Sequence, residues 1–195
     1  MKIPKAALAA SILLFSSLIV RAQVKIPVTN NDLRTNLQKV ISAFPEQFSG
    51  LKGEVIIENP QTTEYTSLLD FKMAAENSIT EYKAKKPLYS WQAQLLSSED
   101  FAEAAKKYKW LYNQLKVMTV NLKGGYSFTF SGDYNEPDER KSFSSSIFKL
   151  TPNASNMPRL KIEALIRFDF PEWKVSLLVY EREREDAEQG DIIEQ

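Results

Sequence analysis

The sequence of 195 residues contains no histidine and no cysteine. Without cysteine there is no thiolate nucleophile and no disulfide, and without histidine there is no imidazole base. The Cys and His ligands of a zinc site are missing as well. These two absences exclude most of the catalytic chemistry open to a small protein and leave carboxylates as the main acid–base groups.

The first 22 residues have the layout of a secretory signal peptide. Lys2 and Lys5 come first, an apolar run from Ala7 to Val20 follows, and Ala22 is a small residue suited to the position before a cleavage site. The run is shorter than the ~20 residues needed to span a bilayer, so we interpret it as a cleaved signal rather than a membrane anchor. We therefore expect a periplasmic or secreted protein with no stable membrane span after cleavage.

Cleavage after Ala22 would leave 173 residues. The removed segment holds three basic residues and no acid, so 22 basic and 25 acidic side chains would remain, a net charge of −3. A slightly acidic chain has no general attraction for nucleic acid, and we expect no nucleic-acid partner. The length suits one domain or two small ones that share a core.

The first half of the mature chain, residues 23–96, reads as a helix followed by strands. Apolar residues recur at helical spacing between Asn30 and Pro45, which predicts a helix that ends at or near the proline. Runs rich in β-branched and aromatic residues follow, separated by turn residues. We expect strands at residues 54–58, 63–72, 78–83 and 88–95.

The second half, residues 97–181, repeats this order. Ser97 and Asp100 are spaced as in a capping box, and an apolar stripe runs along residues 101–115, which predicts a helix there. We expect strands after it at residues 117–122, 126–131, 142–151, 160–168 and 173–180. The charged tail, residues 182–195, is expected to be solvated.

Strands joined by short links favour an α+β fold with an antiparallel sheet and the helices packed on one face. The two halves also share a weak internal sequence similarity. Four residues between Phe44 and Lys52 match four residues between Tyr108 and Lys116 at a constant offset of 64 positions. Two amphipathic helices also produce such matches by chance. The sequence therefore leaves two explanations, a tandem α-β4 repeat and a chance match.

The last two predicted strands present a second face beside the core face. This face carries Lys161, Glu163, Leu165, Arg167, Lys174, Ser176, Leu178 and Tyr180. Its mixture of charged, aliphatic and aromatic side chains is suited to binding, although an ordinary solvated sheet face has the same composition. The candidate binding residues on it are Leu165, Arg167, Leu178 and Tyr180.

Trp110 is a further candidate binding residue. Trp91 and Trp173 lie in alternating strands and are predicted to be core residues. Trp110 instead lies at the edge of the apolar stripe of the second helix. It either covers a sheet edge or is an exposed anchor for a partner.

Carboxylates are the remaining candidates for catalysis. Four occur in the loop at residues 132–140 and two at the last turn: Asp133, Glu136, Asp138, Glu139, Asp169 and Glu172. Their spacing matches no catalytic motif, and the loop has the composition of a hairpin tip, so we assign no catalytic residue. The loop also lacks the register of an EF-hand. No metal or cofactor is expected.

Three segments resemble small uncharacterised secreted proteins of Bacteroidota: FPEQFSGLKGE (residues 44–54), residues 89–116 and EWKVSLLVYEREREDAEQG (residues 172–190). The resemblance covers nearly all of the mature chain and implies an extracytoplasmic location but no activity. The layout of a helix and four strands, repeated, is also similar to that of β-lactamase-inhibitory proteins at the level of fold, with no shared motif.

Export and the absence of catalytic motifs lead to a hypothesis about function. We expect a non-catalytic binding or interaction module of the cell envelope, whose partner is an unknown protein or a small amphiphilic ligand. The alternative is a carboxylate-dependent hydrolase of envelope polymers. That alternative requires two acids about 5–10 Å apart in a cleft, one of them with a raised pKa.

Overall fold

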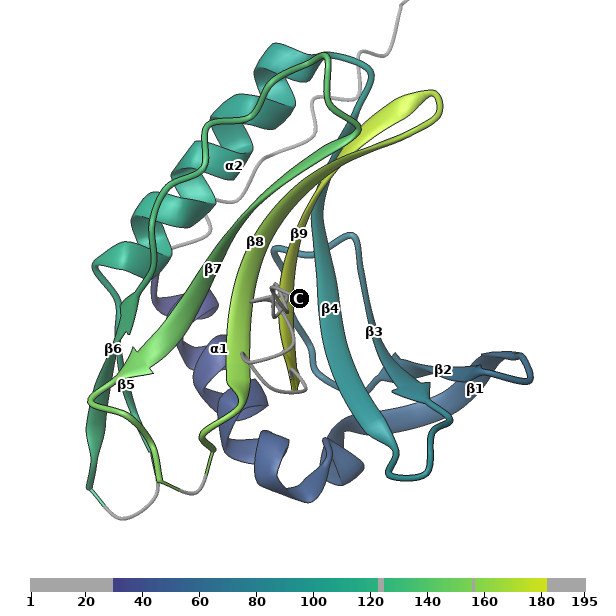
Figure 1. The fold of residues 1–195 in the computed structure, drawn as a ribbon, viewed down its shortest axis with the longest axis vertical. Coiled ribbons are helices and arrows are strands. Elements are labelled where there is room, and N and C mark those ends of the chain that lie inside the picture. The colour runs from purple at the N-terminus through teal and green to yellow at the C-terminus, as the bar shows by residue number, and fades with distance from the viewer. Residues whose placement is uncertain (1–29, 123–124, 156, 182–195) are drawn as a thin grey trace, which may run out of the picture.

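The computed structural model describes residues 30–122, 125–155 and 157–181 (Figure 1). These residues form two α-helices, two 3-10 turns and nine strands. The strands make one antiparallel sheet in the order β1-β2-β3-β4-β9-β8-β7-β6-β5. The predicted α+β class with a large antiparallel sheet is thus confirmed. The predicted signal peptide and charged tail lie outside the described residues.

The first half begins with α1 (Asn30–Ala43), which ends two residues before Pro45 as predicted. Two 3-10 turns, at Phe44–Glu46 and Ser49–Leu51, then reverse the chain. Between them Gln47 and Phe48 both have a φ of +57°, in the left-handed region. The strands that follow are β1 (Lys52–Glu58), β2 (Thr62–Ser67), β3 (Glu76–Tyr82) and β4 (Leu88–Ser98).

β2 ends at Ser67, five residues earlier than the sequence predicts. The apolar residues that extend the pattern, Leu69 and Phe71, are buried in a loop instead. The Phe71 ring stacks on Trp91 with 6.2 Å between centroids, and the Leu69 carbonyl accepts a hydrogen bond from Asn77 Nδ2. The apolar run is therefore a core-filling loop, which strand propensity cannot distinguish from a strand.

The second half begins with α2 (Phe101–Lys116), whose buried stripe agrees with the prediction. Its N-cap is Asp100, whose side chain accepts the Ala102 backbone N–H at 2.8 Å. The predicted capping role of Ser97 is wrong, because Ser97 belongs to β4. The remaining strands are β5 (Thr119–Asn121), β6 (Ser127–Ser131), β7 (Phe143–Thr151), β8 (Leu160–Asp169) and β9 (Glu172–Glu181).

The two halves meet at β4 and β9, the last strand of each half, which pair antiparallel in the middle of the sheet. The predicted boundary between residues 96 and 97 falls inside β4. The two halves therefore share one sheet. They also share one cluster of buried residues.

The core lies on one side of the sheet, which we call the inner face. Trp91, Val179, Ile162 and Phe148 are successive cross-strand neighbours on β4, β9, β8 and β7, and each is fully buried. α2 contacts β4, β6, β8 and β9, and α1 contributes four buried residues to the same cluster. Trp91 and Trp173 are core residues, as predicted. In the described part of the chain, neither helix has the length and apolar character to cross a bilayer.

Substitution of Gly132 tests how closely the start of the loop between β6 and β7 packs against β7. A Cβ at this position would lie 2.3 Å from the Ile147 backbone oxygen, whereas a Cβ at Gly50 meets nothing within 4 Å. We expect Gly132→Ala to lower the free energy of unfolding by about 1–3 kcal/mol. Gly50→Ala should change it by less than about 0.5 kcal/mol. Urea unfolding of both variants measures the difference, and equal midpoints would contradict the close contact.

Candidate functional site

The side of the sheet opposite the core, which we call the outer face, is the face that the sequence predicted. β8 and β9 pair so that the eight predicted residues stand opposite one another on it. The pairs are Lys161 with Tyr180, Glu163 with Leu178, Leu165 with Ser176 and Arg167 with Lys174. β4 extends this face with Ser90, Gln92 and Gln94, because these residues pair with Tyr180, Leu178 and Ser176.

A pocket of about 320 Å³ opens on the outer face where β3, β4, β9 and β8 lie side by side. Leu88 pairs with Tyr82 across β3 and β4, and Ser90 pairs with Tyr180 across β4 and β9. These pairs bring Tyr82 and Leu88 of the first half next to Tyr180 of the second half. The full lining is Tyr82, Leu88, Tyr89, Ser90, Glu163, Leu178, Tyr180 and Glu181.

The two carboxylates of this pocket differ in their partners. Glu181 forms ion pairs with Arg159 and with Lys86, the latter at 3.7 Å. Glu163 is half-buried and makes no hydrogen bond or ion pair with the described residues. A half-buried carboxylate beside apolar side chains favours a positively charged or hydrogen-bond-donating group nearby. The pocket therefore suits a molecule with an apolar body and such a group at one end.

Two of the predicted binding residues, Leu178 and Tyr180, line this pocket, and two do not. Leu165 and Arg167 lie on the same face but farther along β8. Arg167 pairs with Lys174, which is four residues from Leu178 on β9, or about 13 Å at the rise of a strand. The structure therefore divides the predicted set into two parts of one face.

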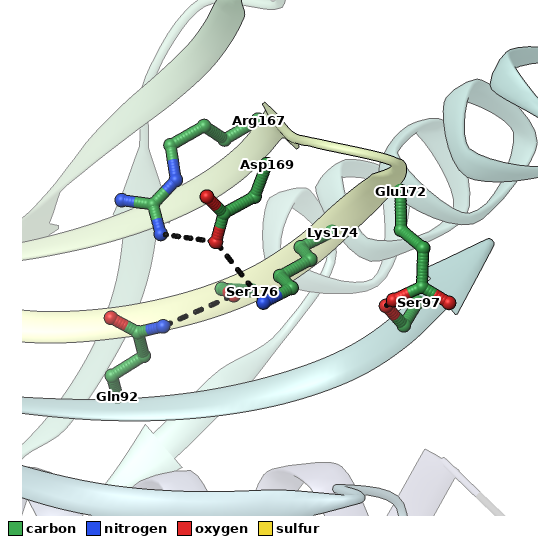
Figure 2. A network of polar contacts seen from close by, with 7 residues as sticks. All are labelled: Gln92, Ser97, Arg167, Asp169, Glu172, Lys174 and Ser176. Atoms are coloured by element: carbon green, nitrogen blue, oxygen red, sulfur yellow. Dashed lines mark hydrogen bonds and ion pairs between the residues drawn. The ribbon is translucent and has the colours of Figure 1, made fainter. Parts of the chain in front are cut away.

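Arg167 belongs to a polar network at the β8–β9 hairpin (Figure 2). Asp169 accepts a hydrogen bond from Lys174 Nζ at 3.0 Å and lies 3.6 Å from the Arg167 guanidinium. The hydrogen bond from Lys174 lowers the pKa of Asp169, with help from the charges of Lys174 and Arg167. Glu172 accepts a hydrogen bond from Ser97 Oγ at 2.6 Å. Both hairpin acids are thus bound to groups of the protein itself.

Trp110 does not lie with the other candidate binding residues. It is on α2, which contacts β4, β6, β8 and β9, and its ring is partly buried against the core. Lys107 Nζ lies over the ring, 4.3 Å from its centroid. This placement fits the interpretation of Trp110 as a cover for the core.

The acidic loop between β6 and β7 runs beside α2 (Figure 1). Tyr134 fixes it there, with ring centroids 5.8 Å from Tyr108 and 4.9 Å from Tyr112. Arg140 donates hydrogen bonds to both carboxylate oxygens of Asp138, which lowers the pKa of Asp138 to about 2. The other three loop acids are exposed. Within the described ranges, no group of three or more Asp or Glu residues is placed to hold a metal ion.

Sequence reasoning missed the half of the pocket that β3 and β4 supply, namely Tyr82, Leu88, Tyr89 and Ser90. The alternation of residues 88–95 shows that Leu88 and Ser90 share a face. It does not show that β4 lies beside β9, because that pairing joins residues 75–90 positions apart. Only the order of strands in the sheet reveals this half of the site.

The comparisons with known proteins return no relatives. No family model, no curated protein and no solved structure matches the chain.

Tyr108 is the buried polar residue that connects α2, the sheet and the acidic loop. Its hydroxyl shares a hydrogen bond of 2.7 Å with Ser146 Oγ and donates to the Asn135 carbonyl at 3.0 Å. Ser146 Oγ in turn accepts the Asn135 backbone N–H at 3.0 Å. Burial raises the pKa of Tyr108 to about 12.

The raised pKa of Tyr108 predicts a loss of stability in alkali. An unfolded tyrosine loses its proton near pH 10, whereas Tyr108 in the folded protein holds it to about pH 12. The free energy of unfolding should therefore be fully retained below pH 10 and fall as the pH rises from 10 to 12. Tyr108→Phe should show a shallower fall and cost about 1 kcal/mol at pH 7.

Urea unfolding at a series of pH values measures this effect. Tyr126→Phe is the matched control, because it removes the hydroxyl group of a tyrosine that is 69% exposed. A Tyr108→Phe protein with the wild-type slope between pH 10 and 12 would contradict the role given to Tyr108.

Proposed function

We propose that this protein is an exported, non-catalytic binding module of the cell envelope, and that the outer face of its sheet holds a small amphiphilic ligand. The observation that supports this proposal is the pocket between β3, β4, β9 and β8. It combines apolar side chains such as Leu88 and Leu178 with the half-buried carboxylate of Glu163, which has no hydrogen-bond or ion-pair partner among the described residues. The ligand is an apolar body that carries a cationic or hydrogen-bond-donating end.

The arrangement of the helices supports the choice of the outer face. We propose that both helices cover the inner face, since residues of α1 and α2 belong to one buried cluster with Trp91, Ile162 and Phe148. We also keep the proposal of a tandem repeat, supported by the pairing of β4 with β9, the last strand of each half. An experimental structure with α1 against the outer face, or with halves that do not superimpose, would contradict these two points.

The carboxylates do not favour the alternative of a hydrolase. A general acid needs a raised pKa, whereas Asp138 and Asp169 have lowered pKa values because Arg140 and Lys174 bind them. Glu172 is bonded to Ser97. The hydrolase stays an untested alternative, and activity of the purified protein on peptidoglycan or envelope polysaccharide would revive it.

Binding of a cationic amphiphile tests the proposed ligand class. We expect submicellar decyltrimethylammonium to bind with measurable heat in a calorimetric titration, and decyl sulfate to bind more weakly because of Glu163. Leu178→Ser should weaken binding about tenfold by removing apolar contact. Glu163→Gln should weaken the binding of the cationic ligand about threefold to tenfold and leave the binding of decanol unchanged.

Leu165→Ser is the matched control for Leu178→Ser. It removes the same side chain from the same face, outside the pocket. Equal losses in the two variants would indicate general adsorption to the sheet. The absence of any saturable binding would contradict the proposed ligand class.

Export has its own test. We propose that the signal peptide at residues 1–22 directs the chain to the periplasm or the medium. Expression of the full chain in a Gram-negative host should yield a soluble extracytoplasmic protein whose intact mass corresponds to a chain that begins at Gln23. Retention of the full-length protein in the cytoplasm would contradict this proposal.

A further inference from the structure

The two edges of the sheet differ in how they are protected. β5 is only three residues long, its central Val120 is buried, and the Asn121 backbone N–H donates to Gln38 Oε1 of α1 at 3.1 Å. β1 has seven residues, and among the described residues it pairs only with β2. Proteins commonly shorten, cover or charge a sheet edge to prevent pairing with other chains. β5 is short and covered, whereas β1 is longer and exposed, although two register shifts interrupt its pairing with β2 and Glu54 and Glu58 flank its apolar residues.

β1 exposes three consecutive large apolar side chains. Val55, Ile56 and Ile57 are 54%, 50% and 49% exposed, and residues 54–58 are exposed throughout. Val55 pairs with Tyr65 and Ile57 pairs with Glu64, with a register shift between the two pairs, and about half of each apolar side chain is exposed. Figure 1 shows β1 and β2 at one end of the sheet.

The surroundings of β1 are acidic. Glu54 and Glu58 flank the apolar residues, and Glu58 has one cationic partner, Lys83, at 2.8 Å. A groove of about 340 Å³ lies beside β1 on the outer face and includes Glu64 and Glu76. The described residues that line it include no lysine or arginine: Ile56, Ile57, Glu64, Glu76, Asn77, Ser78, Thr80, Gln92 and Gln94. A strand placed beside β1 therefore meets apolar contact and negative charge together.

We propose that β1 is a docking edge for an extended polypeptide segment of another protein, one with alternating apolar and basic residues. The segment adds a strand to the sheet through backbone hydrogen bonds. An alternating segment presents its basic side chains on one face and its apolar side chains on the other. On the outer face its basic side chains reach Glu64 of β2 and cover Ile56 and Ile57 with their aliphatic stems. On the other face its apolar side chains contact Val55. This surface is separate from the ligand pocket, and the inference does not depend on the amphiphile.

A second copy of this chain fits the edge less well. In antiparallel self-pairing, only the register centred on Ile56 sets all three apolar residues opposite apolar residues. That register also sets Glu54 of each copy opposite Glu58 of the other. Like charges directly opposite each other destabilise a strand pair. The charge pattern therefore favours a basic partner over a second copy.

A blocked nine-residue peptide of alternating lysine and valine, acetyl-KVKVKVKVK-amide with a fluorescent label, is the probe. Its binding to the full chain is measured by fluorescence anisotropy. We expect saturable binding of the lysine peptide and little binding of acetyl-EVEVEVEVE-amide. A lysine peptide methylated on alternate backbone nitrogens should lose binding, because it keeps its charge but cannot form the ladder of hydrogen bonds.

Matched variants locate the contact. Ile56→Ser should weaken binding about fivefold or more through lost apolar contact, whereas Val117→Ser, at a residue that is 80% exposed outside β1, should not. Glu64→Gln should weaken binding, whereas Glu46→Gln, at an exposed acid outside the groove, should not. Circular dichroism and thermal unfolding establish that each variant is folded.

Three results would overturn the proposal. The first is no saturable binding of the lysine peptide up to about 1 mM, which corresponds to a free energy of binding weaker than about −4 kcal/mol. The second is equal binding of the methylated peptide or of the Ile56→Ser variant. The third is a dimer in analytical ultracentrifugation that Ile56→Ser dissociates, which would make a second copy the occupant. Because the amphiphile titration uses other residues, its outcome is independent of all three.

Discussion

The pairing of β4 with β9 is the constraint on which the rest of the structure depends. It joins the last strand of each half, so it unites two α-β halves into a single sheet. Its register sets Trp91 beside Val179 on the inner face and Ser90 beside Tyr180 on the outer face. A shift by one residue would turn the core side chains of one half outward. The core and the outer-face pocket therefore both depend on the same pairing.

A chain without disulfides needs other means to hold its long connections, and here packing and buried hydrogen bonds supply them. The loop between β6 and β7 carries four acids, yet it is fixed by the rings of Tyr134, Tyr108 and Tyr112 and by the Tyr108–Ser146–Asn135 hydrogen bonds. The acids on this loop thus lie where the tyrosines place them. The lowered pKa of Asp138 follows from its neighbour Arg140 and is suited to a structural ion pair.

The two proposed binding surfaces lie in different parts of the same large sheet and differ in how closely their side chains pack. Near β4 and β9 the outer face is closely built, with Ser176 and Lys161 buried and a pocket between aromatic side chains. At β1 the sheet ends without packing, and its apolar residues are exposed next to acids. The first surface fits a compact ligand, and the second fits an extended chain that completes the sheet.

The sequence by itself determined the local features of this protein: both helices, the approximate positions of the strands and the composition of the outer face of β8 and β9. These follow from periodicity, because a period near 3.6 or 2 assigns each residue to a face without knowledge of its neighbours. Local patterns failed at Leu69 and Phe71, where an apolar run forms a buried loop instead of a strand. They also failed at the start of α2, where the N-cap is Asp100 and not Ser97. The tertiary structure alone decided which strands are adjacent. The order of the strands places Leu88 near Tyr180 in one pocket and puts Val55–Ile57 on an edge strand, whereas Trp110 lies away from the outer face. The sequence could not reveal this order, because pairing between distant strands depends on how the whole core packs.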